Sequence, residues 1–188
     1  MNDQNYAAKQ VYKVLIKAPI DKVWSELVDT TRPRPFFWNG SWDTAAFAAG
    51  NAYRVSSNQG KAVAVIGRIL EMDPPHRLVT TFRLTALPDP PSRVTYTLEE
   101  KDGGTEFCLI TEQVLAGSKS EKSMASGSRF IVDNFKSWVE TGQVTFGARI
   151  TLAMYSLMAP LMPKEKRTCG LICLPAWPTR ASGSTQPE

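Results

Sequence analysis

The chain has 188 residues, 43% of them hydrophobic, which is enough for one globular domain with an additional segment. The net charge of +4 is modest and the basic residues are scattered, which argues against nucleic acid as a partner. Residues 1–10 lack the apolar stretch of a secretory signal, so a cytoplasmic location is expected. The three cysteines are an odd number, and we expect no disulfide framework.

The first elements in chain order are a strand and a short helix. Residues 11–17 alternate, which predicts a half-buried strand with one apolar face made of Tyr12, Val14 and Ile16. Four apolar residues then follow at helical spacing, with Pro19 just before them: Ile20, Val23, Trp24 and Leu27. Residues 32–50 are irregular and aromatic, and we expect a loop whose rings pin it to the domain.

Alternating segments with turn residues between them predict an antiparallel sheet over residues 53–115. The expected strands are residues 53–57, 61–72, 78–85, 93–100 and 105–115, with turns at 58–60, 73–77 and 101–104. One buried face is expected to contain Val94, Tyr96, Leu98, Phe107, Leu109, Thr111 and Gln113, opposite a solvated face with Thr95, Thr97, Glu99 and Glu106. Residues 62–70 are apolar in both phases, so periodicity does not assign their inward face.

Residues 119–141 predict a long amphipathic helix ended by Gly142, whose apolar stripe is Met124, Ile131, Phe135, Trp138 and Val139. Residues 126–128, Ser-Gly-Ser, suggest a kink in it. Residues 144–162 are strongly apolar but interrupted by Arg149 and Pro160. They predict a helix packed on the domain or on a second subunit, in preference to a membrane-surface helix. Residues after 167 lack periodicity and predict a tail without stable order.

These segments together resemble a known superfamily. Residues 11–27 resemble the opening of SRPBCC (START-like, helix-grip) domains, and residues 67–78, GRILEMDPPHRL, resemble a strand-turn-strand of the branch named after the activator of the heat-shock-protein ATPase. The same branch has counterparts of residues 92–96, 103–105, 133–136 and 140–142. Thr111 stands where many relatives have histidine.

The resemblance implies an α+β helix-grip fold, in which a curved antiparallel sheet wraps around the long C-terminal helix with a cavity between them. We expect an N-terminal extension over residues 1–10, the helix-grip domain over 11–142, an additional apolar helix over 143–163 and a tail over 164–188.

The sequence offers little for catalysis. His76 is the only histidine, and its place beside two prolines indicates an exposed turn residue. The chain shows no nucleophile elbow and no phosphate-binding glycine loop, and Cys169 and Cys173 lack the further ligands that zinc needs. We therefore predict no catalytic residue, no metal and no cofactor.

Candidate ligand contacts come instead from the inward phases of the expected sheet and helix. Each of these side chains could equally fill a core without a ligand. An inward Arg68 or Arg83 would favour a carboxylate-bearing ligand, because an unpaired buried guanidinium is costly. The cavity candidates are Trp24, Trp38, Trp42, Tyr53, Phe82, Tyr96, Phe107, Leu109, Thr111, Phe135 and Trp138.

Three functional hypotheses remain open. The first is a noncatalytic domain that binds a small apolar or amphipathic molecule by hydrophobic burial. The second is a protein-interaction module that regulates a chaperone or another partner, with residues 144–162 as the contact for that partner or for another copy. The third is an enzyme of the cyclase or hydrolase type, which needs an inward acid or base such as Asp133 or Glu112.

Overall fold

A computed structural model describes residues 5–57 and 62–158. Within these residues, a seven-stranded antiparallel sheet has the order β1-β7-β6-β5-β4-β3-β2. The strands are β1 (Gln10–Ile16), β2 (Ser41–Asp43), β3 (Ala52–Ser57), β4 (Ala62–Asp73), β5 (Arg77–Leu84), β6 (Ser92–Lys101) and β7 (Gly104–Glu112). The helices are α1 (Ile20–Val28), the short 3-10 helix η1 (Pro35–Phe37), α2 (Lys119–Thr141) and α3 (Phe146–Met158). The α+β helix-grip prediction is confirmed.

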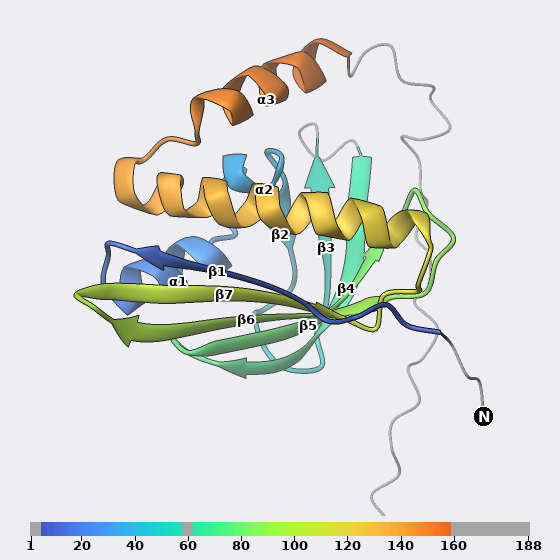
Figure 1. The fold of residues 1–188 in the computed structure, drawn as a ribbon, viewed down its shortest axis with the longest axis horizontal. Helices are drawn as coiled ribbons and strands as arrows, with labels where there is room; N and C mark the ends of the chain where they lie inside the picture. Colours follow the sequence, from blue (N-terminus) through green and yellow to red (C-terminus); the bar gives the residue numbers. More distant parts are fainter. Residues whose placement is uncertain (1–4, 58–61, 159–188) are drawn as a thin grey trace, which may run out of the picture.

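The elements form layers. α2 lies across one face of the sheet, which we call the inner face, and α3 lies on the side of α2 away from the sheet (Figure 1). α1 contacts β6, β7 and α2. The core fills the space between the inner face and the helices, with Phe107 of β7 and Phe135 of α2 both fully buried.

Hydrophobic periodicity predicts most inward residues correctly. The apolar sets of the first helix and of β6 are buried as expected, and so are Phe107, Leu109 and Thr111 of β7. Gln113 is a correction: it is exposed, because β7 ends at Glu112 and Gln113 has a φ of 59°, which breaks the alternation. Thr95 is also buried, although it lies on the outer face, because Val79 and Ile110 flank it in register.

α2 has the predicted bounds, and its ends are capped locally. The Ser118 hydroxyl accepts from the Glu121 backbone N–H at 3.1 Å, and Gly142, with a φ of 73°, donates its N–H to the Trp138 carbonyl at 2.8 Å. The helix runs without interruption through residues 126–128, where the sequence suggests a kink. Gly127 instead gives room to Trp38, whose ring would lie 3.1 Å from an added Cβ.

α2 also covers the free edge of β1. The Lys136 ammonium donates to the Leu15 carbonyl, and the Glu140 carboxylate accepts from the Lys17 backbone N–H at 2.7 Å. Lys136 and Glu140 are themselves joined at 2.7 Å, one helical turn apart. Backbone groups that would otherwise face solvent at this edge therefore find partners on the helix.

α3 is the part of the following apolar segment that lies within the described residues. The Asn134 side-chain oxygen accepts from the Thr145 N–H at 3.0 Å and from its hydroxyl at 2.8 Å, which ties the start of α3 to α2. Ala148 faces the core, whereas three apolar side chains at helical spacing are 75%, 48% and 60% exposed: Phe146, Ile150 and Met154. No helix in the described ranges is long and apolar enough to cross a membrane.

Some expectations concern residues 58–61 and 159–188, which lie outside the described residues. These are the turn at 58–60, the last part of the apolar segment, the tail, and both Cys169 and Cys173. The remaining cysteine, Cys108, is buried and free.

Candidate functional site

The aromatic segment after α1 is more regular than the expected loop. It contains η1 and β2, and a chain of backbone bonds holds it together: Arg34 N–H to Gly40 O at 3.0 Å, Phe37 N–H to Arg34 O at 2.9 Å, and Gly40 N–H to Phe37 O at 2.8 Å. An added Cβ at Gly40 would lie 2.8 Å from the Phe37 carbonyl oxygen, so the turn needs glycine there. The prediction that its rings pin this segment is confirmed for Phe36, Phe37 and Trp42, which are buried.

A row of rings connects the sheet to α2. The centroids of Tyr96 and Phe107 are 6.2 Å apart, those of Phe107 and Phe135 are 4.8 Å apart, and those of Phe135 and Phe36 are 4.7 Å apart. These distances are typical of direct aromatic contact. The aromatic segment therefore packs against both the inner face and α2.

Arg34 is buried at the centre of this aromatic segment, with only 2% of its surface exposed. Its guanidinium carbon lies 4.6 Å above the Trp42 ring centroid and 5.7 Å from that of Phe37. Nη1 donates to the Leu27 carbonyl at the end of α1, at 2.7 Å. The Nε and Nη2 donors of Arg34 and the Trp42 Nε1 donor are buried and have no hydrogen-bond partner among residues 5–57 and 62–158.

Among the described residues, the guanidinium of Arg34 has no ion-pair partner, although Asp29 acts on it electrostatically. Burial lowers the pKa of Arg34 to about 9, so the group is still cationic at pH 7. Burial raises the pKa of both Tyr53 and Tyr96 well above the ordinary tyrosine value, which keeps these neighbours neutral. The Tyr53 hydroxyl is occupied, since it donates to the Thr81 carbonyl at 2.7 Å.

The structure brings only part of the predicted ligand set together. Trp42, Tyr53 and Tyr96 lie near Arg34, and Phe82 meets Phe37 at a centroid distance of 6.5 Å. Leu109, Phe107 and Phe135 belong to the buried layer between the sheet and α2. Whether any of them contacts a ligand stays a prediction.

Four other predicted residues have different surroundings. Trp38 stacks on Phe130 at 4.7 Å, and Trp24 is buried on α1. Trp138 is half-buried, and its Nε1 donates to a Glu26 oxygen at 2.8 Å. Thr111 donates to the Gln10 side-chain oxygen at 3.3 Å.

The buried arginine of the candidate site is Arg34, whereas the arginines considered from the sequence were Arg68 and Arg83. Leu78, Thr80 and Phe82 are the buried phase of β5, so Arg83 lies in the outer phase, although its Nε is also buried without a partner in the described part of the chain. Arg68 donates to the Gly50 carbonyl at 3.1 Å. Arg34 carried one weak signal, because it stands between two prolines and the second of them is followed by three aromatic residues.

The acids considered for catalysis do not face the interior. Asp133 is exposed on α2, and Glu112 lies in the outer phase of β7, where it pairs with Lys9 at 3.3 Å. His76 is exposed in the turn after β4, as predicted. The described ranges contain no group of three residues that could hold a metal ion.

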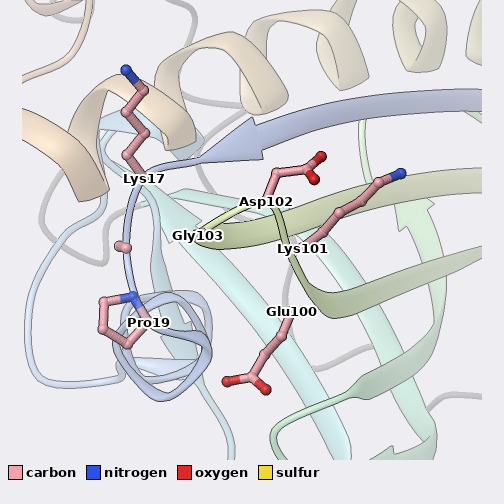
Figure 2. A pocket seen from close by; sticks show the side chains of 8 residues that line it. Lys17, Pro19, Glu100, Lys101, Asp102 and Gly103 are labelled. Atoms are coloured by element: carbon pink, nitrogen blue, oxygen red, sulfur yellow. The ribbon is translucent and has the colours of Figure 1, made fainter.

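A surface hollow of about 520 Å³ lies between the end of β1 and the β6–β7 turn. Figure 2 shows that the side chains of Lys17, Glu100 and Lys101 point in different directions around it. Lys101 is also paired with Glu106 at 3.4 Å. The charged groups around the hollow therefore do not converge on a common point. The interior around Arg34 is the better candidate site.

Comparison with known proteins identifies the family. Residues 17–140 match the family described as Activator of Hsp90 ATPase homolog 1-like protein, which is well over half of the chain. The chain belongs to this family. The matched range includes Arg34 and the whole ring row and ends one residue before the last residue of α2, so α3 lies outside it.

Several solved structures share the fold of this Hsp90-activator-like chain. CalU16 from Micromonospora echinospora is 22% identical, with a TM-score of 0.55 over 81% of this chain and 87% of that one. The Aha1 dimer from Colwellia psychrerythraea is 13% identical, with a TM-score of 0.56 over 72% and 98%. An HSP90 activator from Plasmodium falciparum is 14% identical, with a TM-score of 0.56 over 70% and 95%. No curated protein matches the sequence.

Proposed function

We propose that this Hsp90-activator-like domain binds a small amphipathic molecule between the inner face of the sheet and α2, with its polar end at Arg34 and Trp42. The supporting observation is that three buried donors, Arg34 Nε, Arg34 Nη2 and Trp42 Nε1, have no acceptor among the described residues. A buried donor without a partner costs about 1–3 kcal/mol, and more when it is charged. A bound molecule that offers acceptor oxygens would remove this cost.

The apolar part of the ligand would gain its affinity by burial against the rings. Covering about 200 Å² of apolar surface contributes about 5 kcal/mol, from which the cost of ordering the ligand is subtracted. Phe36 and Phe135 are in direct contact at 4.7 Å. Because the core fills the space between the inner face and α2, the ligand is accommodated there only when the aromatic segment separates from α2.

The experiment is native mass spectrometry of protein purified without detergent and then incubated with Nile red, a neutral apolar dye. The wild type is expected to retain either a small molecule from the host or the dye. Trp42→Phe should retain less of a host molecule that has acceptor oxygens, because it loses a donor that faces the site. Trp138→Phe is the matched control, since its indole N–H already has a partner in Glu26. A wild type that binds neither would refute the proposal.

A specific observation favours a second candidate function, association with another copy through α3. The exposed stripe of Phe146, Ile150 and Met154 recurs every four residues, so two such helices can pair their stripes in antiparallel. The relative from Colwellia psychrerythraea was solved as a dimer. Regulation of a chaperone stays a prediction of the family resemblance.

Sedimentation equilibrium of the wild type and Ile150→Glu tests this candidate. We expect a dimer for the wild type and a monomer for the variant, because a charge in the stripe would be buried on pairing. The control is Thr151→Glu, next to the stripe in sequence but a third of a helical turn away from it. A monomeric wild type, or a dimer that survives Ile150→Glu, would contradict pairing through α3.

A further inference from the structure

The proposed site also indicates the chemical class of its ligand. We infer that the ligand bound at Arg34 is a monocarboxylic acid with an apolar body, an inference that rests on the proposed function. Arg34 is 2% exposed, and the donors that it leaves without a partner within residues 5–57 and 62–158 are Nε and Nη2. These two N–H groups lie on the same edge of a guanidinium and point in parallel, which matches the two oxygens of a carboxylate.

The arginine is held in place from its other sides. Nη1 is occupied by the Leu27 carbonyl at 2.7 Å, and the Arg34 backbone N–H is occupied by the Gly40 carbonyl at 3.0 Å. The Trp42 ring lies under the guanidinium plane at 4.6 Å. These contacts fix the orientation of the free edge before a ligand arrives, so little conformational entropy is lost when the carboxylate binds.

The charge of the site selects an anion of charge −1. Asp29 is the carboxylate that acts electrostatically on Arg34, but its oxygens already bind Arg32 at 2.7 Å and Thr31 at 2.8 Å. Tyr53 and Tyr96 contribute no charge at neutral pH. A carboxylate neutralises Arg34, whereas a dianionic phosphate would leave one buried negative charge without a partner, which is costly.

The indole of Trp42 completes the set of donors. Its Nε1 is buried and unpartnered, and its ring lies against both Arg34 and Tyr53. A carboxylate has about four lone-pair positions, which is enough for all three donors, Nε, Nη2 and Nε1. A primary amine or a hydrocarbon offers nothing to these three donors, and an alcohol offers a single oxygen.

Isothermal titration of the full chain with decanoate, decanol and decylamine tests the inference. We expect wild-type protein to bind decanoate about 10- to 100-fold more tightly than decanol, the range expected for charge-assisted hydrogen bonds, and to bind decylamine least. Arg34→Met should abolish the preference for decanoate over decanol, because the carboxylate loses its charged two-donor partner. Arg34→Lys keeps the charge but loses the two-donor edge, and should weaken decanoate binding about tenfold.

Two controls locate the effect. Arg83→Met removes another arginine with a buried unpartnered Nε, this one in the outer phase of β5, and should leave the preference for decanoate intact. In ¹H–¹⁵N spectra, decanoate should shift the indole signal that Trp42→Phe removes, and decanol should shift it less.

The outcomes separate this inference from the proposed function. Equal affinity for decanoate and decanol in the wild type overturns the carboxylate assignment and leaves a site for neutral molecules. A preference for decanoate that persists in Arg34→Met overturns the role of Arg34. A wild type that binds neither decanoate nor decanol, and no Nile red, overturns the binding site itself and the inference with it.

Discussion

Replacing Arg34 with methionine is expected to stabilise the ligand-free protein. Burial lowers the pKa of Arg34 from 12.5 to about 9, which corresponds to about 5 kcal/mol against the charged form at about 1.4 kcal/mol per pKa unit. Methionine removes this cost and fills a similar volume with a flexible apolar chain. It also loses the hydrogen bond to the Leu27 carbonyl, about 1–2 kcal/mol, and the contact of the cation with the Trp42 ring, about 2 kcal/mol. The net gain is about 1–2 kcal/mol.

Urea denaturation followed by circular dichroism at pH 7 measures this difference in the free energy of unfolding. The melting temperature should rise by about 2–4 °C for each kcal/mol gained in a chain of this size. Arg32→Met is the matched control, because Arg32 has a side chain that is 47% exposed and pairs with Glu26 and Asp29. Exposed pairs contribute less than about 1 kcal/mol each, so the control should be slightly less stable. A loss of stability in Arg34→Met above about 1 kcal/mol would refute the reasoning, since it would mean that the guanidinium is already well satisfied.

Four further substitutions, one of them a control, test the fold. Gly67→Ala places a Cβ 2.0 Å from a backbone oxygen of β5 and should cost about 3 kcal/mol in the same urea assay, whereas Gly147→Ala, with open space around it, should be neutral or stabilising. Ser118→Ala removes the cap of α2 and should cost about 1 kcal/mol; an unchanged midpoint would show that the cap is dispensable. Burial raises the pKa of Glu140, but its hydrogen bonds, including that from Lys136, outweigh this and hold the pKa below 4.5. Glu140→Gln should therefore be less stable than wild type at pH 7, and the difference should vanish as the pH falls below the folded-state pKa; a difference that persists in acid would contradict this ion-pair account.

The regular elements were predictable because their signals are local. α2 begins and ends where its periodicity does, between a serine that can cap it and a glycine that can adopt positive φ. The alternation of β6 and β7 gave the inward residues of both strands as far as Thr111. The pattern failed at Gln113, where a positive φ shifts the phase of the side chains without any change in hydrophobicity.

The candidate site was much less predictable, because it depends on contacts between distant segments. β2 is three residues long, too short for alternation to show. β4 is apolar in both phases and its register shifts between Ile69 and Glu71, so the inward face near Arg68 follows only from its pairing with β5. Arg34 is buried because the aromatic segment folds over it and the Leu27 carbonyl reaches it, and neither fact is visible in the residues on either side.

The contacts of α2 with β1 affect how copies of this protein can meet. A sheet with an unpaired outer strand invites another chain to extend it by backbone pairing. Here the Leu15 carbonyl and the Lys17 N–H are already bound by Lys136 and Glu140. The opposite margin is β2, three residues long, where an extension would find few backbone groups to bind. Edge-to-edge strand pairing between molecules is therefore disfavoured at both edges of the sheet. Self-association is directed instead to surfaces made by side chains.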